Sequence, residues 1–267
     1  MTKLAVIGAG KMAEAIIQGL LEKKVYLPAD ITTTDISAER LQYMTTTYGI
    51  RTSSNNLAPL REAQTIILAV KPQTIRGVLE ELWAVGNQAQ IIISIAAGTT
   101  IATIDPDHTR KVARVMPNTP AVIGAAASAV AFAGPFTDLE RNTVLKLFES
   151  IGSVVEIRES EINAVTGLSG SGPAFVFHLL QGFIEAGKKL GLSEAVATKL
   201  TYQTFIGSAK LAQESGKSLN ELIDNVTSPN GTTWAGRQIL ENSTVQKTIS
   251  ETIVRAKERA DELSQGK

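Results

Sequence analysis

The first 160 residues alternate short β-branched apolar runs with longer segments of helical periodicity. Continuous apolar runs of this length are typical of strands buried on both faces of a parallel sheet. They predict strands at 4–7, 31–34, 65–70, 91–95, 112–116, 128–132 and 154–157. The segments between them predict helices at 12–21, 38–48, 73–82 and 138–151, the last opened by a capping box of Thr137 and Glu140. The alternation predicts an α/β domain over residues 1–160.

From residue 161 onward the pattern is helical throughout, with no run that predicts a strand. Ser193 is positioned to cap one helix, and Ser218 with Glu221 forms the capping box of another. The expected helices are 173–190, 194–214, one that begins after Ser218, and two beyond the loop around Pro229, the last at 245–263. Residues 161–267 are therefore predicted to form a second, all-α domain.

Composition narrows the possible functions. Twenty-six basic residues balance twenty-six acidic ones, so nucleic-acid binding is not expected. The chain has no cysteine and two histidines, which argues against a metal site; we expect His178 to pack in a core and His108 to lie on the surface. No apolar run approaches the roughly 18 residues that span a bilayer, and the first residues lack a signal-peptide pattern. We expect a cytoplasmic protein with no membrane partner.

A glycine-rich motif links the first predicted strand to the first predicted helix. Its residues are Gly8, Ala9, Gly10, Lys11, Met12 and Ala13, which match G-x-G-x-x-A. In this motif the first glycine makes the tight turn, the second lets the backbone approach a pyrophosphate, and the small third residue lets the helix pack close to the strand. The helix amino terminus then favours the anion. The motif in this setting predicts a Rossmann-type dinucleotide-binding domain.

Asp35 lies where the second strand is expected to end, about 25 residues after the glycines, the usual place of an acid that binds the ribose 2′-hydroxyl. A carboxylate there would repel a 2′-phosphate and favour NADH. The alternative is that Asp35 is only a turn residue or the amino-terminal cap of the next helix. Arg40 follows one turn later and could reach a phosphate. The choice between NAD and NADP stays open at this point.

Three further segments have unusual compositions. The first is 115–120, in which Met116, Pro117 and Asn118 end a strand; the second is the small-residue turn 168–174; the third is 226–233, just before a helix. Backbone amides of the third could bind a carboxylate. Each segment taken alone could instead be structural: a rigid turn, a close helix crossing and a capped loop.

Together these motifs resemble the pyrroline-5-carboxylate reductase family. The resemblance covers nearly the whole chain: GAGKMAEAI at 8–16, LAVKPQ at 68–73, SIAAG at 94–98, VMPNTPA at 115–121, TGLSGSGPAFVF at 166–177 and VTSPNGTT at 226–233. It implies a dinucleotide-binding domain followed by a helical dimerisation domain. It also implies self-association into dimers, which in this family often form rings. Asn230, where the family usually has glycine, and Asp35-Ile36 depart from the family pattern.

The resemblance also implies site residues. Those implied to bind NADP or NAD, besides the glycine motif and Asp35, are Asn56, Ala69, Val70, Lys71, Pro72, Ala96, Ala97, Gly98, Met116, Pro117 and Asn118. Those implied for a small cyclic imino acid substrate are Asn118, Ser169, Gly170, Ser171, Gly172, Pro173, Asn230, Gly231, Thr232 and Thr233. No metal is implied.

The implied reaction is reduction of a protonated cyclic imine to L-proline. An iminium is already electrophilic, so the protein mainly positions the reactants, and Thr233 is the expected hydrogen-bond partner of the ring nitrogen. A β-hydroxyacid dehydrogenase shares the two-domain plan but needs a lysine that the first half of the helix at 173–183 lacks. A non-catalytic sensor is the other alternative, although it would have no need of Thr232 and Thr233.

Overall fold

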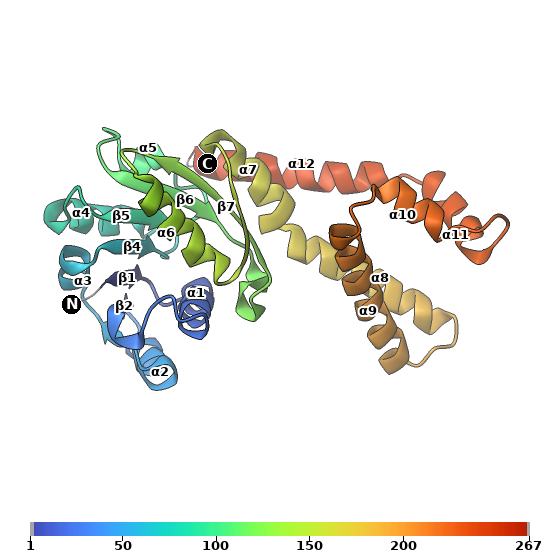
Figure 1. Ribbon diagram of the computed structural model, residues 1–267, viewed down its shortest axis with the longest axis horizontal. Helices are drawn as coiled ribbons and strands as arrows, with labels where there is room; N and C mark the ends of the chain where they lie inside the picture. Colours follow the sequence, from blue (N-terminus) through green and yellow to red (C-terminus); the bar gives the residue numbers. More distant parts are fainter. Residues whose placement is uncertain (1–2, 266–267) are drawn as a thin grey trace. The chain divides into compact units, whose positions relative to one another are not determined.

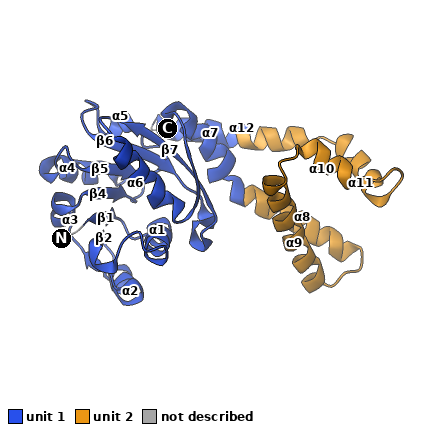
Figure 2. Ribbon diagram, viewed as in Figure 1, with its two compact units in different colours: residues 1–173, 254–267 blue, residues 174–253 orange. Residues whose placement is uncertain are grey.

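The computed structural model describes residues 3–265 (Figure 1). The chain separates into two compact units, one of residues 1–173 with 254–267 and one of residues 174–253 (Figure 2). The first unit thus contains the carboxyl-terminal turns of the last helix as well as the α/β part. The predicted domain boundary at residue 160 rests on sequence pattern, and it stays a prediction beside this contact-based division.

Unit 1 is built on an eight-stranded sheet in the order β3-β2-β1-β4-β5-β6-β7-β8. The strands are β1 Leu4–Ile7, β2 Ile31–Thr34, β3 Arg51–Ser53, β4 Thr65–Leu68, β5 Ile91–Ser94, β6 Lys111–Met116, β7 Ala126–Ala133 and β8 Gly152–Glu156. Six of the seven neighbouring pairs are parallel, and β6 pairs with β7 antiparallel. The expectation of a parallel sheet is therefore corrected at β7. A loop through the short helix at 119–123 is too short for a crossover and returns the chain in the opposite direction.

Helices cover both faces of this sheet, as the alternation predicted. They are α1 Lys11–Glu22, α2 Ala38–Tyr48, α3 Leu57–Glu62, α4 Ile75–Val85, α5 Ile101–Ile104, α6 Asp138–Glu149 and α7 Ile162–Val165, with short 3₁₀ turns at Pro28–Asp30, Thr119–Ile123 and Glu159–Glu161 and a π-helix at Thr166–Gly170. The predicted capping box of Thr137 and Glu140 is present at the start of α6.

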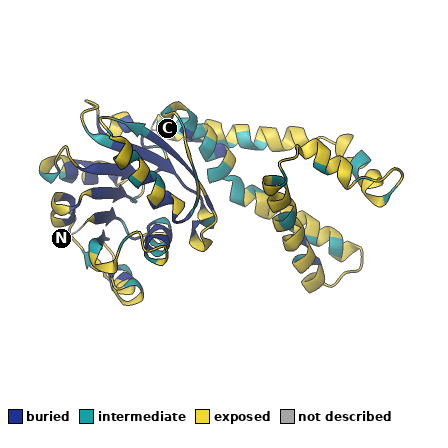
Figure 3. Ribbon diagram, in the orientation of Figure 1, coloured by how far each residue is buried: buried dark blue, intermediate teal, exposed yellow. Residues whose placement is uncertain are grey.

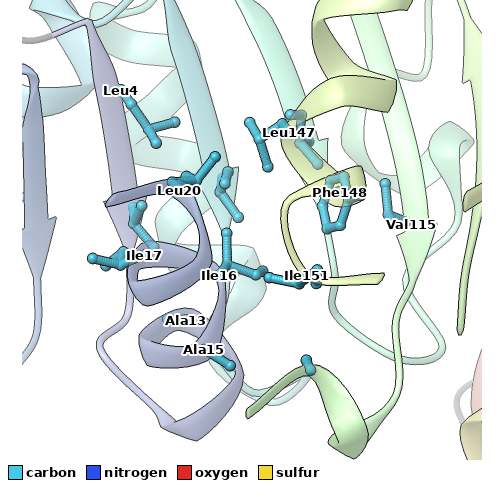
Figure 4. Close-up of a cluster of buried hydrophobic side chains, with 14 of the residues drawn as sticks. Leu4, Ala13, Ala15, Ile16, Ile17, Leu20, Val115, Leu147, Phe148 and Ile151 are labelled. Carbon is cyan, nitrogen blue, oxygen red and sulfur yellow. The ribbon is translucent and has the colours of Figure 1, made fainter. Parts of the chain in front are cut away.

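The core of unit 1 has two layers because side chains alternate across each strand. In β1, Leu4 and Val6 point to the layer that contains α1 and α6, while Ala5 and Ile7 point to the layer that contains α3, α4 and α5. Figure 4 shows Ile16 and Leu20 of α1 in the same cluster as Phe148 of α6. Burial on both faces explains the continuous apolar runs of β1, β4 and β5.

Four strands or α-helices were not predicted from the sequence. The strand β3 is short and polar and lies at the sheet edge, α3 contains a proline, and α5 and α7 are single turns. None of them has a run of residues long enough to establish a hydrophobic period.

The helices beyond the sheet are α8 Gly172–Lys189, α9 Glu194–Glu214, α10 Leu219–Asn225, α11 Thr232–Glu241 and α12 Val245–Ser264. The predicted Ser193 cap and the Ser218–Glu221 capping box are both confirmed. No strand occurs among the described residues after Glu156. None of the described helices is long and apolar enough to cross a membrane.

Unit 2 leaves many large apolar side chains exposed, whereas the central strands β1, β4 and β5 of unit 1 are buried (Figure 3). The helix α8 has no fully buried residue, although its sequence is strongly apolar. His178 is exposed on this helix and lines an open apolar groove with Phe183, so the expectation of a core histidine is wrong for the single chain. Its apolar neighbours in the sequence indicated burial, but within one chain nothing covers that face of α8. His108 is exposed, as expected.

Candidate functional site: a cleft at the strand ends of unit 1

A cleft of about 460 Å³ lies beyond the carboxyl ends of β1, β2 and β4. The strand order reverses between β1 and β4, and open α/β sheets bind ligands at such a switch point. The volume is within the usual range for small-molecule sites. The lining residues are Ile7, Gly8, Gly10, Thr34, Asp35, Ile36, Ser54, Asn56, Ala69, Val70, Lys71, Thr74 and Val78.

The glycine-rich turn forms one wall of this cleft. Gly8 has φ +97°, and a Cβ there would lie 2.7 Å from the carbonyl oxygen of Ala69, so the turn requires glycine. A Cβ on Gly10 would meet no atom within 4 Å, which leaves that side of the turn open. Gly10 is also the amino-terminal cap of α1, and no side chain bonds to this end of the helix. A diphosphate therefore fits at the amino terminus of α1.

Thr34 at the end of β2 adds a second indication of a ligand. Its hydroxyl is buried and has no hydrogen-bond partner among the described residues, yet the residue lines the cleft. A buried polar atom without a partner is costly unless a ligand or water satisfies it.

Asp35 braces the glycine-rich turn. Its Oδ2 accepts the backbone N–H of Ala9 at 2.9 Å, and its Oδ1 accepts the N–H of Ser37 at 2.9 Å. Ser37, not Asp35, caps α2, because its side chain accepts the N–H of Arg40. Asp35 is therefore not the cap of α2, but its bond to the N–H of Ser37 two residues on makes it a turn residue, as the alternative also allowed. Its position in the cleft wall agrees with a ribose ligand.

Arg40 does not line the cleft; it is bound to other groups. Its Nη2 bonds to the carboxylate of Glu14, its Nε donates to the carbonyl of Ala9, and its guanidinium lies 4.8 Å from the ring centre of Tyr43. Glu14 also accepts the hydroxyls of Tyr43 and Tyr48 at 2.9 and 3.0 Å. Burial alone would raise the pKa of Glu14, but the three donors together lower it. The carboxylate is therefore ionised near neutral pH.

The structure brings only some of the expected cofactor residues to this cleft. Gly8, Gly10, Asp35, Asn56 and the segment 69–71 line it. Asn56 also donates to Glu81 at 2.7 Å. The sequence did not identify six of the lining residues, which are Ile7, Thr34, Ile36, Ser54, Thr74 and Val78. Ser54 follows the unpredicted strand β3. Thr74 and Val78 lie within the predicted helix 73–82, but the helical pattern does not indicate which of its residues border the cleft.

The other expected cofactor residues lie outside the cleft lining. These are Ala9, Lys11, Met12, Ala13, Pro72, Ala96, Ala97, Gly98, Met116, Pro117 and Asn118. Ala13 is buried under the turn, as the close packing of α1 on the sheet requires. Gly98 follows β5 with φ +75°, and a Cβ there would lie 3.3 Å from the carbonyl oxygen of Leu263 in α12.

Asn118 joins two of the segments that the sequence identified separately. Its Nδ2 donates to the carbonyl of Ser169 at 3.0 Å, and its Oδ1 accepts the N–H of Ala127 at 2.9 Å. A Cβ on Gly170 would lie 3.6 Å from the sulfur of Met116. Ser169 and Gly170 are part of a π-helix, a feature that is frequent at functional sites. The side chain of Asn118 therefore fixes this π-helix against the sheet.

The loop before α11 lies within unit 2. Asn230 has φ +59°, so asparagine takes the left-handed conformation that glycine would allow. Gly231 is the amino-terminal cap of α11 without a side-chain bond, and a Cβ on it would lie 2.3 Å from Ser228 Oγ. Thr232 and Thr233 are exposed in the first turn. Thr233 does not cap this helix, since Gly231 occupies that position.

Among residues 3–265, no group of three or more histidine, aspartate or glutamate side chains could hold a metal ion. Unit 1 contains a cleft lined by the glycine-rich turn and small side chains. Unit 2, taken by itself, presents a helix amino terminus with two exposed hydroxyls.

Comparison with known proteins covers both parts of the chain. Residues 159–263 match the pyrroline-5-carboxylate reductase dimerisation family, and residues 3–98 match the coenzyme F420-dependent NADP oxidoreductase family. Curated pyrroline-5-carboxylate reductases from Methanosarcina acetivorans and Synechocystis are 39% and 38% identical, each over 98% of this chain and 97% and 98% of their own.

Solved structures show the same similarity. A pyrroline-5-carboxylate reductase from Coxiella burnetii has a TM-score of 0.92 at 32% identity, with 98% of both chains covered. The Plasmodium falciparum enzyme, solved with NADP bound, has a TM-score of 0.88 at 27% identity, again with 98% of both chains covered. These matches and the nucleotide cleft lead to one conclusion: this chain belongs to the pyrroline-5-carboxylate reductase family.

Proposed function

We propose that this chain reduces the cyclic imine 1-pyrroline-5-carboxylate to L-proline, using NADH or NADPH, in the last step of proline biosynthesis. The observation that carries this proposal is full-length identity of 35–39% to curated reductases with that name, on a chain whose cleft fits a dinucleotide. The chain is an NAD(P)H-dependent oxidoreductase by the same evidence.

Unit 1 holds the nucleotide in this proposal. The amides at the start of α1 bind the pyrophosphate, with Gly10 leaving room for it, and the carboxylate of Asp35 binds the adenosine ribose. Ile36 is fully exposed beside Asp35 and supplies an apolar surface for a flat base. Ala69, Val70 and Lys71, at the end of β4, border the same cleft. When bound, the reduced nicotinamide supplies a hydride to the imine carbon.

The amino terminus of α11 holds the imino acid. The N–H of Gly231 already donates to the carbonyl of Ser228 at 3.0 Å, whereas the first N–H groups of the helix itself have no side-chain cap. The amide of Thr232 therefore binds the substrate carboxylate. The Thr233 hydroxyl accepts a hydrogen bond from the iminium N–H. We also assign the turn Ser169–Pro173 to the substrate, on the resemblance of its sequence to the family.

No side chain has to protonate the substrate during the reaction. The iminium carries its proton already, the hydride completes a C–H bond, and the C=N electron pair becomes the amine lone pair. The protein therefore accelerates the step by holding the reacting atoms in position. Such a mechanism agrees with the absence of an ionisable residue in the loop 226–233.

The chain self-associates through its carboxyl-terminal region, which matches a dimerisation family over residues 159–263. The exposed apolar side chains of unit 2 support this, because a partner would bury them. We further propose that the dimers join into a ring, and that the assembly acts in the cytoplasm without a nucleic-acid or membrane partner.

The test is the imine-dependent oxidation of reduced nucleotide, followed by absorbance with NADH and NADPH in parallel. Formation of proline in stoichiometric amounts is the expected result. Tight nucleotide binding without turnover would instead identify a sensor, and nucleotide-dependent oxidation of a β-hydroxyacid would identify a hydroxyacid dehydrogenase.

A further inference from the structure

Nucleotide choice depends on what a 2′-phosphate would meet beside the ribose. Asp35 offers a carboxylate at this position, and an anion there repels a phosphate. A nearby cation could compensate, and Arg40, in the first turn of α2, is the arginine closest in sequence to Asp35. The availability of Arg40 therefore bears directly on whether NADPH can bind.

In this structure Arg40 is not free to bind a 2′-phosphate. Its guanidinium bonds to Glu14 and to the carbonyl of Ala9 and stacks against Tyr43. The Arg40 and Glu14 side chains are only 22% and 14% exposed, so solvent screens this ion pair less than a surface pair.

The surroundings of Glu14 favour its ionised carboxylate. It receives one hydrogen bond from Arg40 and two from the tyrosine hydroxyls, and it lies in the first turn of α1, where the helix dipole favours an anion. A carboxylate this close to a pyrophosphate site would repel the ligand if it were uncompensated. Arg40 thus neutralises the charge of Glu14, and Glu14 in turn keeps the guanidinium of Arg40 from binding a 2′-phosphate.

We propose that Glu14 is a second determinant of nucleotide choice, which favours NADH by holding Arg40 away from a 2′-phosphate. It is a positioning residue, since it acts through Arg40. The inference rests on the proposed function only in assigning the nucleotide to this cleft. Asp35 accepts the N–H of Ala9 and Arg40 donates to its carbonyl, so Asp35 and the arginine held by Glu14 contact the same residue of the turn.

The first experiment measures the binding of two fragments of the nucleotide, so it does not depend on turnover. Binding of 2′,5′-ADP, which carries the 2′-phosphate, and of ADP is measured by calorimetry for the parent and for Glu14→Gln. Glutamine keeps the acceptor oxygen for the tyrosines and removes the charge. We expect the affinity ratio of 2′,5′-ADP to ADP to rise about three- to tenfold, the value of a moderately screened charge-assisted bond.

Two further variants distinguish a release of Arg40 from a general effect of removing negative charge. Glu22→Gln removes the same charge from α1 about 12 Å further along the helix, at an exposed position, and should leave the ratio unchanged. Glu14→Gln/Arg40→Gln should lose the gain seen in Glu14→Gln, because the cation itself is gone. The ratio of kcat/KM for NADPH to that for NADH should follow the same order in all variants.

An unchanged fragment ratio in a folded Glu14→Gln variant would overturn the proposal. So would a gain that persists in the double variant, since Arg40 would then not be its source. Either result leaves imine reduction intact, and a chain that binds both fragments as expected but never turns over the imine would refute the proposed function alone.

Discussion

The carboxylate of Asp35 accepts the backbone N–H of Ala9 at 2.9 Å, across 26 residues of sequence. The residue expected to bind the ribose is therefore also a brace for the turn that receives the pyrophosphate. Any substitution of Asp35 changes both functions unless it preserves the acceptor oxygen.

Asp35→Asn separates these two functions. Asparagine can still accept the Ala9 N–H through its carbonyl oxygen, but it removes the charge that opposes a 2′-phosphate. We expect the ratio of kcat/KM for NADPH to kcat/KM for NADH to rise by roughly tenfold. The repulsion that is removed should be similar in size to one charge-assisted bond, about 1.5–3 kcal/mol before solvent screening. Asp35→Ser should shift the ratio in the same direction while also lowering the melting temperature. Steady-state kinetics with both nucleotides checks this, and a constant ratio would assign Asp35 to the brace alone.

The two glycines of the turn should respond differently to substitution. Gly10→Val should abolish nucleotide binding with the fold intact, since its Cβ would enter space that no protein atom occupies. Gly8→Ala should instead lower stability, because its Cβ would meet the Ala69 carbonyl at 2.7 Å and its φ is +97°. Calorimetric titration and thermal unfolding of both variants test this. Undiminished nucleotide affinity in a folded Gly10→Val protein would remove the pyrophosphate from this turn.

Much of this fold is predictable from sequence, because it follows from local patterns. The buried strands, the glycine turn and the capping boxes of Thr137 and Ser218 each need only a few neighbouring residues. The bridge from Asn118 to Ser169 and the Glu14–Arg40 pair join residues 51 and 26 positions apart, and no local pattern indicates them. The strand β7 was predicted, but its reversed direction was missed for a similar reason, since apolar runs give no direction.

The candidate site was predictable only in part. The glycine turn and Asp35 were found from spacing alone, whereas the loop 226–233 was assigned through family resemblance. The exposure of His178 could not be deduced, because an apolar helix face looks the same in sequence whether a neighbouring helix or a second chain covers it.

Self-association should depend on the exposed apolar residues of unit 2. Phe177 is 63% exposed in the single chain, so Phe177→Glu should leave each chain folded while it shifts the assembly toward monomer. Leu139→Glu in α6 is the matched control, since Leu139 is 78% exposed in unit 1. Sedimentation velocity of the parent and both variants provides the measurement. A monomeric parent chain would contradict the account, and equal effects of the two variants would place the interface elsewhere.

Thr233 should matter for turnover and little for stability. Its hydroxyl has no hydrogen-bond partner in residues 3–265, and Gly231 is the residue that caps α11. Thr233→Ala should lower kcat about ten- to a hundredfold, the value of one hydrogen bond to a charged partner, while nucleotide affinity stays constant. Thr233→Ser keeps the oxygen and should retain most activity. Parallel kinetics and thermal unfolding check this, and a loss of stability with kcat intact would transfer the role to Thr232 or the backbone amides.

Direct transfer of hydride to the imine carbon is the central claim, and isotopic labelling tests it most directly. The protein is given the cyclic imine and NADH that carries deuterium in both C4 positions of the nicotinamide, and the proline formed is analysed by mass spectrometry and NMR. The account predicts one deuterium per proline, on the ring carbon that was double-bonded to nitrogen. Unlabelled proline, or label on any other carbon, would contradict it.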